Sequence, residues 1–211
     1  MKSYAQDSED LILYSMLKGV QKGKYIDVGA SDPEHLSVTK LFYDLGWNGL
    51  NIEPLDYRHK LLVEQRPNDI NLRIALGEKH DVDILYDIDT GSTFKKEIAD
   101  SYNLNFPTKE VEIFTLSEIY DTYCSDWENV HFCKIDVEGY EKQVLLGVKD
   151  WNKFRPWVFC MESTIPSTDI PCYEEWEYIL LENGYELFYE KGINRYYIDS
   201  DKKDKISQVE I

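Results

Sequence analysis

Short strand-like runs alternate with helix-like segments along most of the chain. Residues 24–30 have the pattern of a short buried strand that ends in a glycine turn. Four apolar residues then repeat at the spacing of one buried helical stripe: Val38, Leu41, Phe42 and Leu45. Because parallel strands need a crossover, usually a helix, between them, this alternation predicts βαβ units. The chain should therefore fold as an α/β protein with a doubly wound, mostly parallel sheet.

The remaining elements follow in chain order. We expect helices over 8–18, 35–45, 138–148 and 173–183, with a further helix starting at a Thr115–Glu118 capping box. We expect strands over 24–30, 49–54, 70–76, 82–86, 111–114, 130–135, 157–161, 185–189 and 195–198, with a polar loop between 86 and 111. Only a short turn around Gly192 separates the last two strands, so the C-terminal strand should run antiparallel.

A chain of 211 residues predicts one domain. We expect an N-terminal helical element over 1–22 and a Rossmann-like core over 23–211, in three layers (α/β/α). The longest apolar run, residues 157–161, is far too short to span a membrane. The N-terminus has no signal-peptide pattern, so we expect a cytoplasmic protein.

The chain is strongly acidic, with 40 Asp and Glu against 23 Lys and Arg and a formal net charge of −17. Nucleic-acid affinity rests largely on cationic side chains that neutralise phosphates. This composition argues against DNA or RNA as a partner and favours a small-molecule or glycan ligand. The sequence is compatible with a homo-oligomer but does not define one.

Ligands of such sheets bind beyond the carboxyl ends of the strands. The first strand ends in Asp27, Gly29, Ala30 and Ser31, with one glycine where a dinucleotide site would have three. Flanking carboxylates suit an amine or sulfonium better than a pyrophosphate, although an ordinary turn fits Gly29 equally well. Glu53 ends the second strand, 24 residues after Gly29, where an acidic residue accepts hydrogen bonds from ribose hydroxyls.

A second acidic group follows the later strands. Asp136 ends a central strand, Glu138, Tyr140 and Glu141 precede the next helix, and Glu162 with Ser163 follows the next strand. Such carboxylates can orient a hydroxyl, take its proton or hold a divalent cation. Glu138 and Glu141 also suit a simple helix N-terminus. His35, after the first turn, is a further candidate base.

In these residues the chain resembles the FkbM-type methyltransferases, a branch of the class I S-adenosylmethionine enzymes. The resemblance runs from about Gln6 to about Glu162. It rests on residues 25–32 (YIDVGASD), 45–54 (LGWNGLNIEP), 75–77 (ALG), 115–116 (TL) and 134–141 (KIDVEGYE), with Pro156 and Glu162. Pro33 departs from the glycine common in the family, which puts only the local loop shape in doubt.

The resemblance implies S-adenosylmethionine as cofactor. Asp27, Gly29 and Ser31 would line its methionine part, with Ala30 adjacent, and Glu53 would bind the ribose, with Pro54 beside it. Ala75 and Leu76 would flank the adenine, and Gln6 and Asp10 would border the site.

The acceptor implied by the resemblance is a hydroxyl group, often of a sugar, as in polysaccharide biosynthesis. Asp136 would sit near the sulfonium, and the catalytic candidates are Asp136, Glu138, Glu162 and His35. Tyr140, Glu141 and Ser163 would surround the acceptor, and Mg²⁺ between Asp136 and Glu162 is a further hypothesis. Two alternatives stay open: an NAD-dependent oxidoreductase, and a catalytically inactive subunit that binds a nucleoside cofactor.

Overall fold

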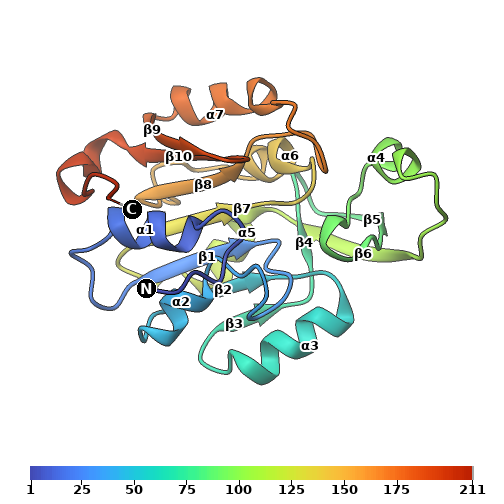
Figure 1. Ribbon diagram of the computed structural model, residues 1–211, viewed down its shortest axis with the longest axis horizontal. Helices are drawn as coiled ribbons and strands as arrows, with labels where there is room; N and C mark the ends of the chain where they lie inside the picture. The colour runs from blue at the N-terminus through green and yellow to red at the C-terminus, as the bar shows by residue number, and fades with distance from the viewer. Residues whose placement is uncertain (211) are drawn as a thin grey trace.

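The centre of the molecule is a seven-stranded sheet in the order β3-β2-β1-β7-β8-β10-β9 (Figure 1). The computed structural model describes residues 1–210. The strands are β1 (Lys24–Val28), β2 (Asn48–Ile52), β3 (Ile70–Leu72), β7 (Phe132–Ile135), β8 (Val158–Glu162), β9 (Tyr185–Lys191) and β10 (Asn194–Asp199). The β3-β2, β2-β1, β1-β7 and β7-β8 pairs are parallel, whereas β10 is antiparallel to β8 and β9. The predicted mostly parallel sheet with an antiparallel C-terminal strand is confirmed.

Helices cover both faces of this sheet because both faces of its central strands are apolar. On β8, Phe159 and Met161 belong to one core cluster, and Val158 and Cys160 belong to the other. The first cluster packs under α5 (Leu116–Tyr123), α6 (Glu141–Leu146) and α7 (Glu177–Glu182). The second packs under α1 (Glu9–Met16) and α2 (Lys40–Asp44). The predicted three-layer arrangement is confirmed.

The predicted capping box begins α5. The Thr115 hydroxyl accepts from the Glu118 amide at 3.1 Å, and a Glu118 carboxylate oxygen accepts from the Thr115 amide at 2.8 Å. Two otherwise unpaired amides at the helix start are thereby satisfied. Leu116, Ile119 and Tyr120 then turn one face of α5 into the core.

The predicted strand over 70–76 is wrong as a single element. The chain leaves the main sheet after β3 and enters a second, three-stranded sheet as β4 (Ala75–Leu76). There β6 (Thr108–Phe114) lies between β4, to which it is parallel, and β5 (Asp81–Tyr86), to which it is antiparallel. Apolar residues continue at strand spacing through both segments without a turn signal, so the sequence does not reveal the change of sheet.

Two helices were missing from the sequence interpretation. α3 (Asp56–Gln65) buries little more than Leu62 and Arg58, so it lacks the apolar stripe that reveals a helix. α4 (Lys96–Ser101), followed toward β6 by the rest of the predicted polar loop, buries only Ala99. We call the segment from β5 to β6, which includes α4, the arm. In Figure 1 the arm projects from the body on the side where β1, β7 and β8 end.

The predicted helix over 35–45 begins only at Lys40. The Asp32 carboxylate accepts from the amides of Glu34 (2.9 Å) and His35 (2.7 Å), and Leu36 has a left-handed backbone (φ 56°). These local hydrogen bonds hold the chain in a turn that competes with helix formation.

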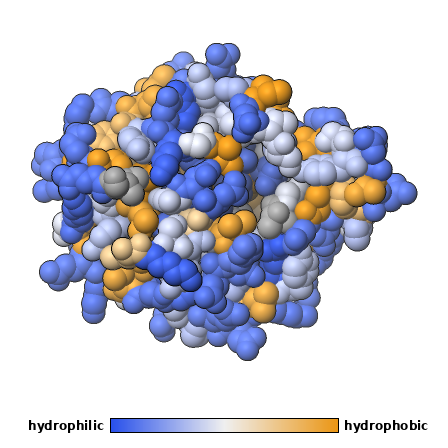
Figure 2. All heavy atoms as spheres, in the orientation of Figure 1, coloured by the Kyte–Doolittle hydropathy of each residue, from blue (hydrophilic) through white to orange (hydrophobic). Residues whose placement is uncertain are grey.

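The face shown in Figure 2 is mostly hydrophilic, and its hydrophobic residues lie in small scattered groups. Within residues 1–210, the helices are too short or too polar to cross a membrane.

Candidate functional site

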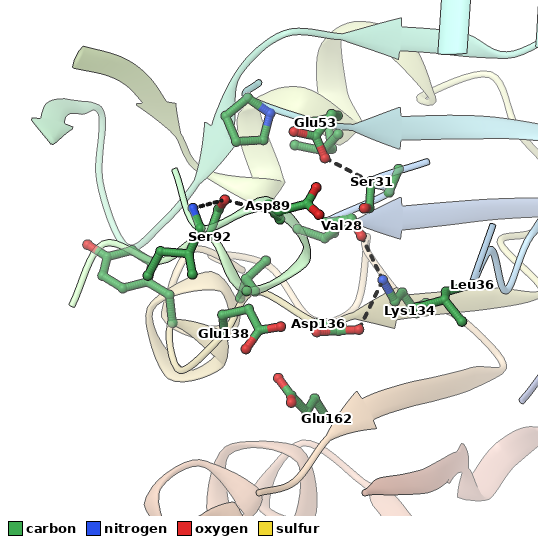
Figure 3. Close-up of a pocket in the computed structure, with 18 of the residues that line it drawn as sticks. Val28, Ser31, Leu36, Glu53, Asp89, Ser92, Lys134, Asp136, Glu138 and Glu162 are labelled. Atoms are coloured by element: carbon green, nitrogen blue, oxygen red, sulfur yellow. Dashed lines mark hydrogen bonds and ion pairs between the residues drawn. The ribbon is translucent and has the colours of Figure 1, made fainter. Parts of the chain in front are cut away.

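A cavity of about 570 Å³ lies between the carboxyl ends of β1, β2, β7 and β8 and the arm. Its size falls in the range of pockets that enclose small ligands. The body contributes the glycine turn after β1, Glu53 after β2, Asp136 after β7 and Glu162 at the end of β8, and the arm contributes Ile88, Asp89 and Ser92 among others. Figure 3 shows Glu53 on one side of this cavity and Glu162 on the other.

Gly29 brings two strand ends together. Its backbone is left-handed (φ +79°), and a Cβ atom there would lie 1.9 Å from the carbonyl oxygen of Asp136. The amides of Gly29 and Ala30 both donate to the carbonyl of Ile52, which fixes the turn against β2 as well. The absent side chain of Gly29 thus admits the backbone of Asp136, and Gly29 also lines the cavity.

Glu53 is buried beneath this turn. Its two carboxylate oxygens accept from the Ser31 amide at 2.8 Å and the Leu55 amide at 2.7 Å. Burial raises the pKa of Glu53, and these two backbone amides partly offset the rise. All of the predicted cofactor residues except Asp10 line the cavity: Gln6, Asp27, Gly29, Ala30, Ser31, Glu53, Pro54, Ala75, Leu76 and Asp136.

Arg58 links this end of the cavity to the arm. It comes from α3, is 6% exposed, and donates from Nη1 to the Ser31 hydroxyl at 2.6 Å. Its Nη2 forms an ion pair with Asp89 of the arm. Sequence reasoning missed both residues, because α3 carries no apolar stripe and the arm was interpreted as a loop.

Lys134 is buried in the middle of β7 between apolar neighbours. Its ammonium donates to the Gly29 carbonyl at 2.7 Å and lies 3.4 Å from carboxylate oxygens of both Asp27 and Asp136. Burial opposes its charge, but Asp136 and Asp27 outweigh that effect and raise the pKa of Lys134 above its usual value. Thr39 completes the group by donating to the other oxygen of Asp27 at 2.9 Å. A lysine inside an apolar strand was the signal that sequence reasoning passed over.

Three carboxylates converge at the far end of the cavity. Asp136, Glu138 and Glu162 each place an oxygen within 4.8 Å of the others, and Figure 3 shows them directed toward one another. Burial, together with Asp136 and Glu141, raises the pKa of Glu138 to about 8. Burial, together with Asp136, Glu138 and Glu141, raises the pKa of Glu162 well above its usual value. Tyr140 also lines this end.

Two predicted site residues near the N-terminus lie outside the cavity lining. Asp10 faces the chain start, where it accepts from the Ser3 hydroxyl at 2.6 Å and the Tyr4 amide at 2.8 Å. Its neighbour Glu9 lines the cavity instead and accepts from Asn194 at 2.8 Å. His35 is exposed on the turn after β1, so the structure does not place it as a base facing the cavity.

Two predicted acceptor residues are also displaced from the lining. Glu141 is buried and accepts from the Val137 amide (3.1 Å) and the Gly139 amide (3.0 Å), so it holds the turn before α6. The Ser163 hydroxyl donates to the carbonyl of Ile193 at 2.7 Å, and its neighbour Thr164 lines the cavity.

Comparison with known proteins agrees with this geometry. The Methyltransferase FkbM domain matches residues 27–187. A solved structure, the methyltransferase FkbM from Methylobacillus flagellatus KT, superposes with a TM-score of 0.54 at 18% sequence identity, over 84% of this chain and 44% of that one. The likeness shows a shared fold, and this chain spans less than half the length of that protein. A search of curated proteins gave no match. Because the family match extends from the glycine turn into β9, over most of the sequence, the chain belongs to the FkbM methyltransferase family.

Proposed function

We propose that this protein is an S-adenosylmethionine-dependent methyltransferase that methylates a hydroxyl group of a sugar or glycan precursor, as in polysaccharide biosynthesis. The observation that carries the proposal is one continuous cavity with two different ends. One end offers the buried Glu53 carboxylate beside apolar Ala75 and Leu76, and the other offers the carboxylates of Asp136, Glu138 and Glu162.

The Glu53 end suits the nucleoside half of the cofactor. Each Glu53 oxygen accepts one backbone amide, which fixes the carboxylate and leaves further lone pairs for ribose hydroxyls. Ala75, Leu76 and Pro54 supply apolar surface for a purine ring. The methionine half would then extend along the glycine turn toward Asp136, which places the reactive methyl near the acidic end.

Methyl transfer at that end is an in-line displacement. The acceptor oxygen forms a bond to the methyl carbon as the carbon–sulfur bond breaks, its electron pair goes to sulfur, and the hydroxyl proton passes to a base. Alignment of oxygen, carbon and sulfur accounts for much of the rate. Asp136, Glu138 and Glu162 are the candidate bases, and the raised pKa values of Glu138 and Glu162 make their ionised carboxylates stronger bases. The exposed His35 is not retained in this role.

The acidic cavity disfavours the oxidoreductase alternative. A pyrophosphate at the glycine turn would lie among the carboxylates of Asp27, Glu53 and Asp136, with Lys134 already paired to two of them. The inactive-subunit alternative predicts cofactor binding without turnover, so it is separated by an activity measurement.

The test is transfer of labelled methyl groups from S-adenosylmethionine to a panel of neutral, acidic and amino sugars, with release of S-adenosylhomocysteine measured in parallel. Asp136→Asn should lower turnover by about 100-fold or more, the usual effect of losing a positioned acid–base group. His35→Ala is the matched control and should leave turnover unchanged. Cofactor binding without transfer to any acceptor would support the inactive subunit, and NAD reduction would support the oxidoreductase.

A further inference from the structure

The three carboxylates at the acidic end lack matching positive charge. Of the three, Asp136 forms an ion pair with Lys134. The same ammonium also pairs with Asp27 and donates to the Gly29 carbonyl. Within residues 1–210, Glu138 and Glu162 form no ion pair with a lysine, arginine or histidine. A buried carboxylate without a partner is costly, and either proton uptake or a bound cation relieves that cost.

An unpartnered oxygen of Glu162 indicates where a cation would bind. The residue is 4% exposed, and its Oε2 atom is buried without a hydrogen-bond donor in the described part of the chain. It lines the cavity and faces Asp136 and Glu138 (Figure 3). Native proteins seldom leave a buried carboxylate oxygen unpartnered, and such an oxygen marks a site for an ion or ligand that the chain itself does not supply.

We propose that Asp136, Glu138 and Glu162 form a binding site for a hard divalent cation of the Mg²⁺ and Mn²⁺ class. All three ligands are carboxylate oxygens, which such cations prefer, and the set contains no histidine or thiolate that would favour zinc. Two oxygens on opposite sides of such a cation lie about 4–5 Å apart, twice the cation–oxygen distance. Each of the three residues places an oxygen within 4.8 Å of the others, which is close enough for one cation to contact all three.

The fold holds the ligands in place. Asp136 directly follows β7 and Glu162 is the last residue of β8, so both sit on neighbouring parallel strands. Glu138 completes the set from a left-handed turn (φ 53°). The open side of the cluster faces the cavity, where remaining coordination positions would take water or the acceptor hydroxyl. Only this last role rests on the proposed methyl transfer; binding of the cation does not.

The experiment is a titration of the full chain with Mn²⁺, in which free Mn²⁺ is followed by electron paramagnetic resonance. We expect one Mn²⁺ per chain with a Kd below about 1 mM, displaced by Mg²⁺. Glu162→Gln should weaken binding at least about tenfold, since loss of even an outer-shell partner costs 10–100-fold. The charge-matched control is Glu174→Gln, on the exposed surface next to α7, which should bind as the wild type does. Glu138→Gln provides a second variant if Glu162→Gln does not fold.

Three results would overturn the proposal. One is the absence of stoichiometric binding to the wild type below about 1 mM Mn²⁺. Another is equal weakening by Glu174→Gln and Glu162→Gln, which would reveal only a diffuse acidic surface. The third is Mn²⁺ binding that Glu162→Gln and Glu138→Gln both leave unchanged. Calorimetry with S-adenosylhomocysteine on the same samples separates the two proposals, because Mn²⁺ binding without cofactor binding would leave the cation site standing while the proposed function failed.

Discussion

Replacing Lys134 by methionine would remove the ammonium that joins the ends of β1 and β7. The Lys134 side chain is 9% exposed, and carboxylate oxygens of its two partners, Asp27 and Asp136, lie 3.4 Å from its ammonium. At an effective dielectric constant of about 20, each contact corresponds to about 5 kcal/mol of Coulomb attraction, most of which offsets the cost of burial. What remains after the substitution is an unpaired carboxylate on Asp27, which is 1% exposed.

Removal of one partner from a buried ion pair typically costs about 3–5 kcal/mol. For a chain of this size, Lys134→Met should therefore lower the melting temperature by on the order of 10 °C. Urea unfolding followed by tryptophan fluorescence measures the loss in free energy. Asp27→Asn in the Lys134→Met background removes the unpaired charge and should recover part of the loss.

The exposed pair between Lys60 and Asp56 provides the control, because Lys60→Met removes a lysine of the same kind from a solvated helix surface. That variant should unfold close to the wild type. A loss below about 1 kcal/mol for Lys134→Met, the usual range of surface pairs, would refute the view that this lysine neutralises the strand ends.

Three further predictions concern the framework of the site. Gly29→Ala should lower the free energy of unfolding by more than about 3 kcal/mol, because its Cβ would meet the Asp136 carbonyl. Gly46→Ala has the same left-handed backbone but open space around it, and should cost only about 1–2 kcal/mol. Equal losses of the two variants in urea unfolding would contradict the close approach at Gly29. Thr115→Ala should cost about 1 kcal/mol through loss of the capping box, and an unchanged thermal unfolding curve would show that the cap is dispensable. Burial and neighbouring carboxylates raise the pKa of Glu138 to about 8, so its contribution to stability is present at low pH and is lost as pH rises toward 8. Glu138→Gln should therefore gain stability relative to the wild type over this range. Parallel pH profiles of unfolding free energy for the two proteins would exclude the raised pKa.

The layered sheet could be predicted from the sequence because the patterns that indicate its strands and helices are local and repeated. Apolar runs of strand length alternate with helical stripes, and each pair of them dictates a βαβ unit. The rule that ligands bind at carboxyl ends of strands then selected Glu53, Asp136 and Glu162, which the structure brings to one cavity.

The arrangement of the arm could not be predicted from the sequence, for a physical reason. No turn signal interrupts the strand-like pattern over 70–76, although the chain changes sheets within it. Local periodicity does not show which neighbouring strand a segment pairs with. α3 and α4 bury few apolar side chains, so Arg58 and the arm residues that line the cavity carried no periodic signal.

Errors within the site are mostly shifts of one residue. Asp10 was predicted where Glu9 lines the cavity, and Ser163 where Thr164 does. A helix turns its side chains by about 100° per residue and a strand by about 180°, so adjacent positions face different surroundings. Residue type and spacing identify the strand end that carries a site, but the backbone angles at that end decide which neighbour points inward.

The central claim is that the cavity binds S-adenosylmethionine with its ribose on Glu53. The most direct measurement is a calorimetric titration of the wild type and Glu53→Gln with S-adenosylhomocysteine, with NAD tested alongside. We predict binding at one site per chain in the wild type, no binding of NAD, and affinity at least about tenfold weaker in Glu53→Gln, the loss expected for hydrogen bonds to a charged group. Binding of NAD but not of S-adenosylhomocysteine, or equal affinity of the two proteins for S-adenosylhomocysteine, would contradict the account.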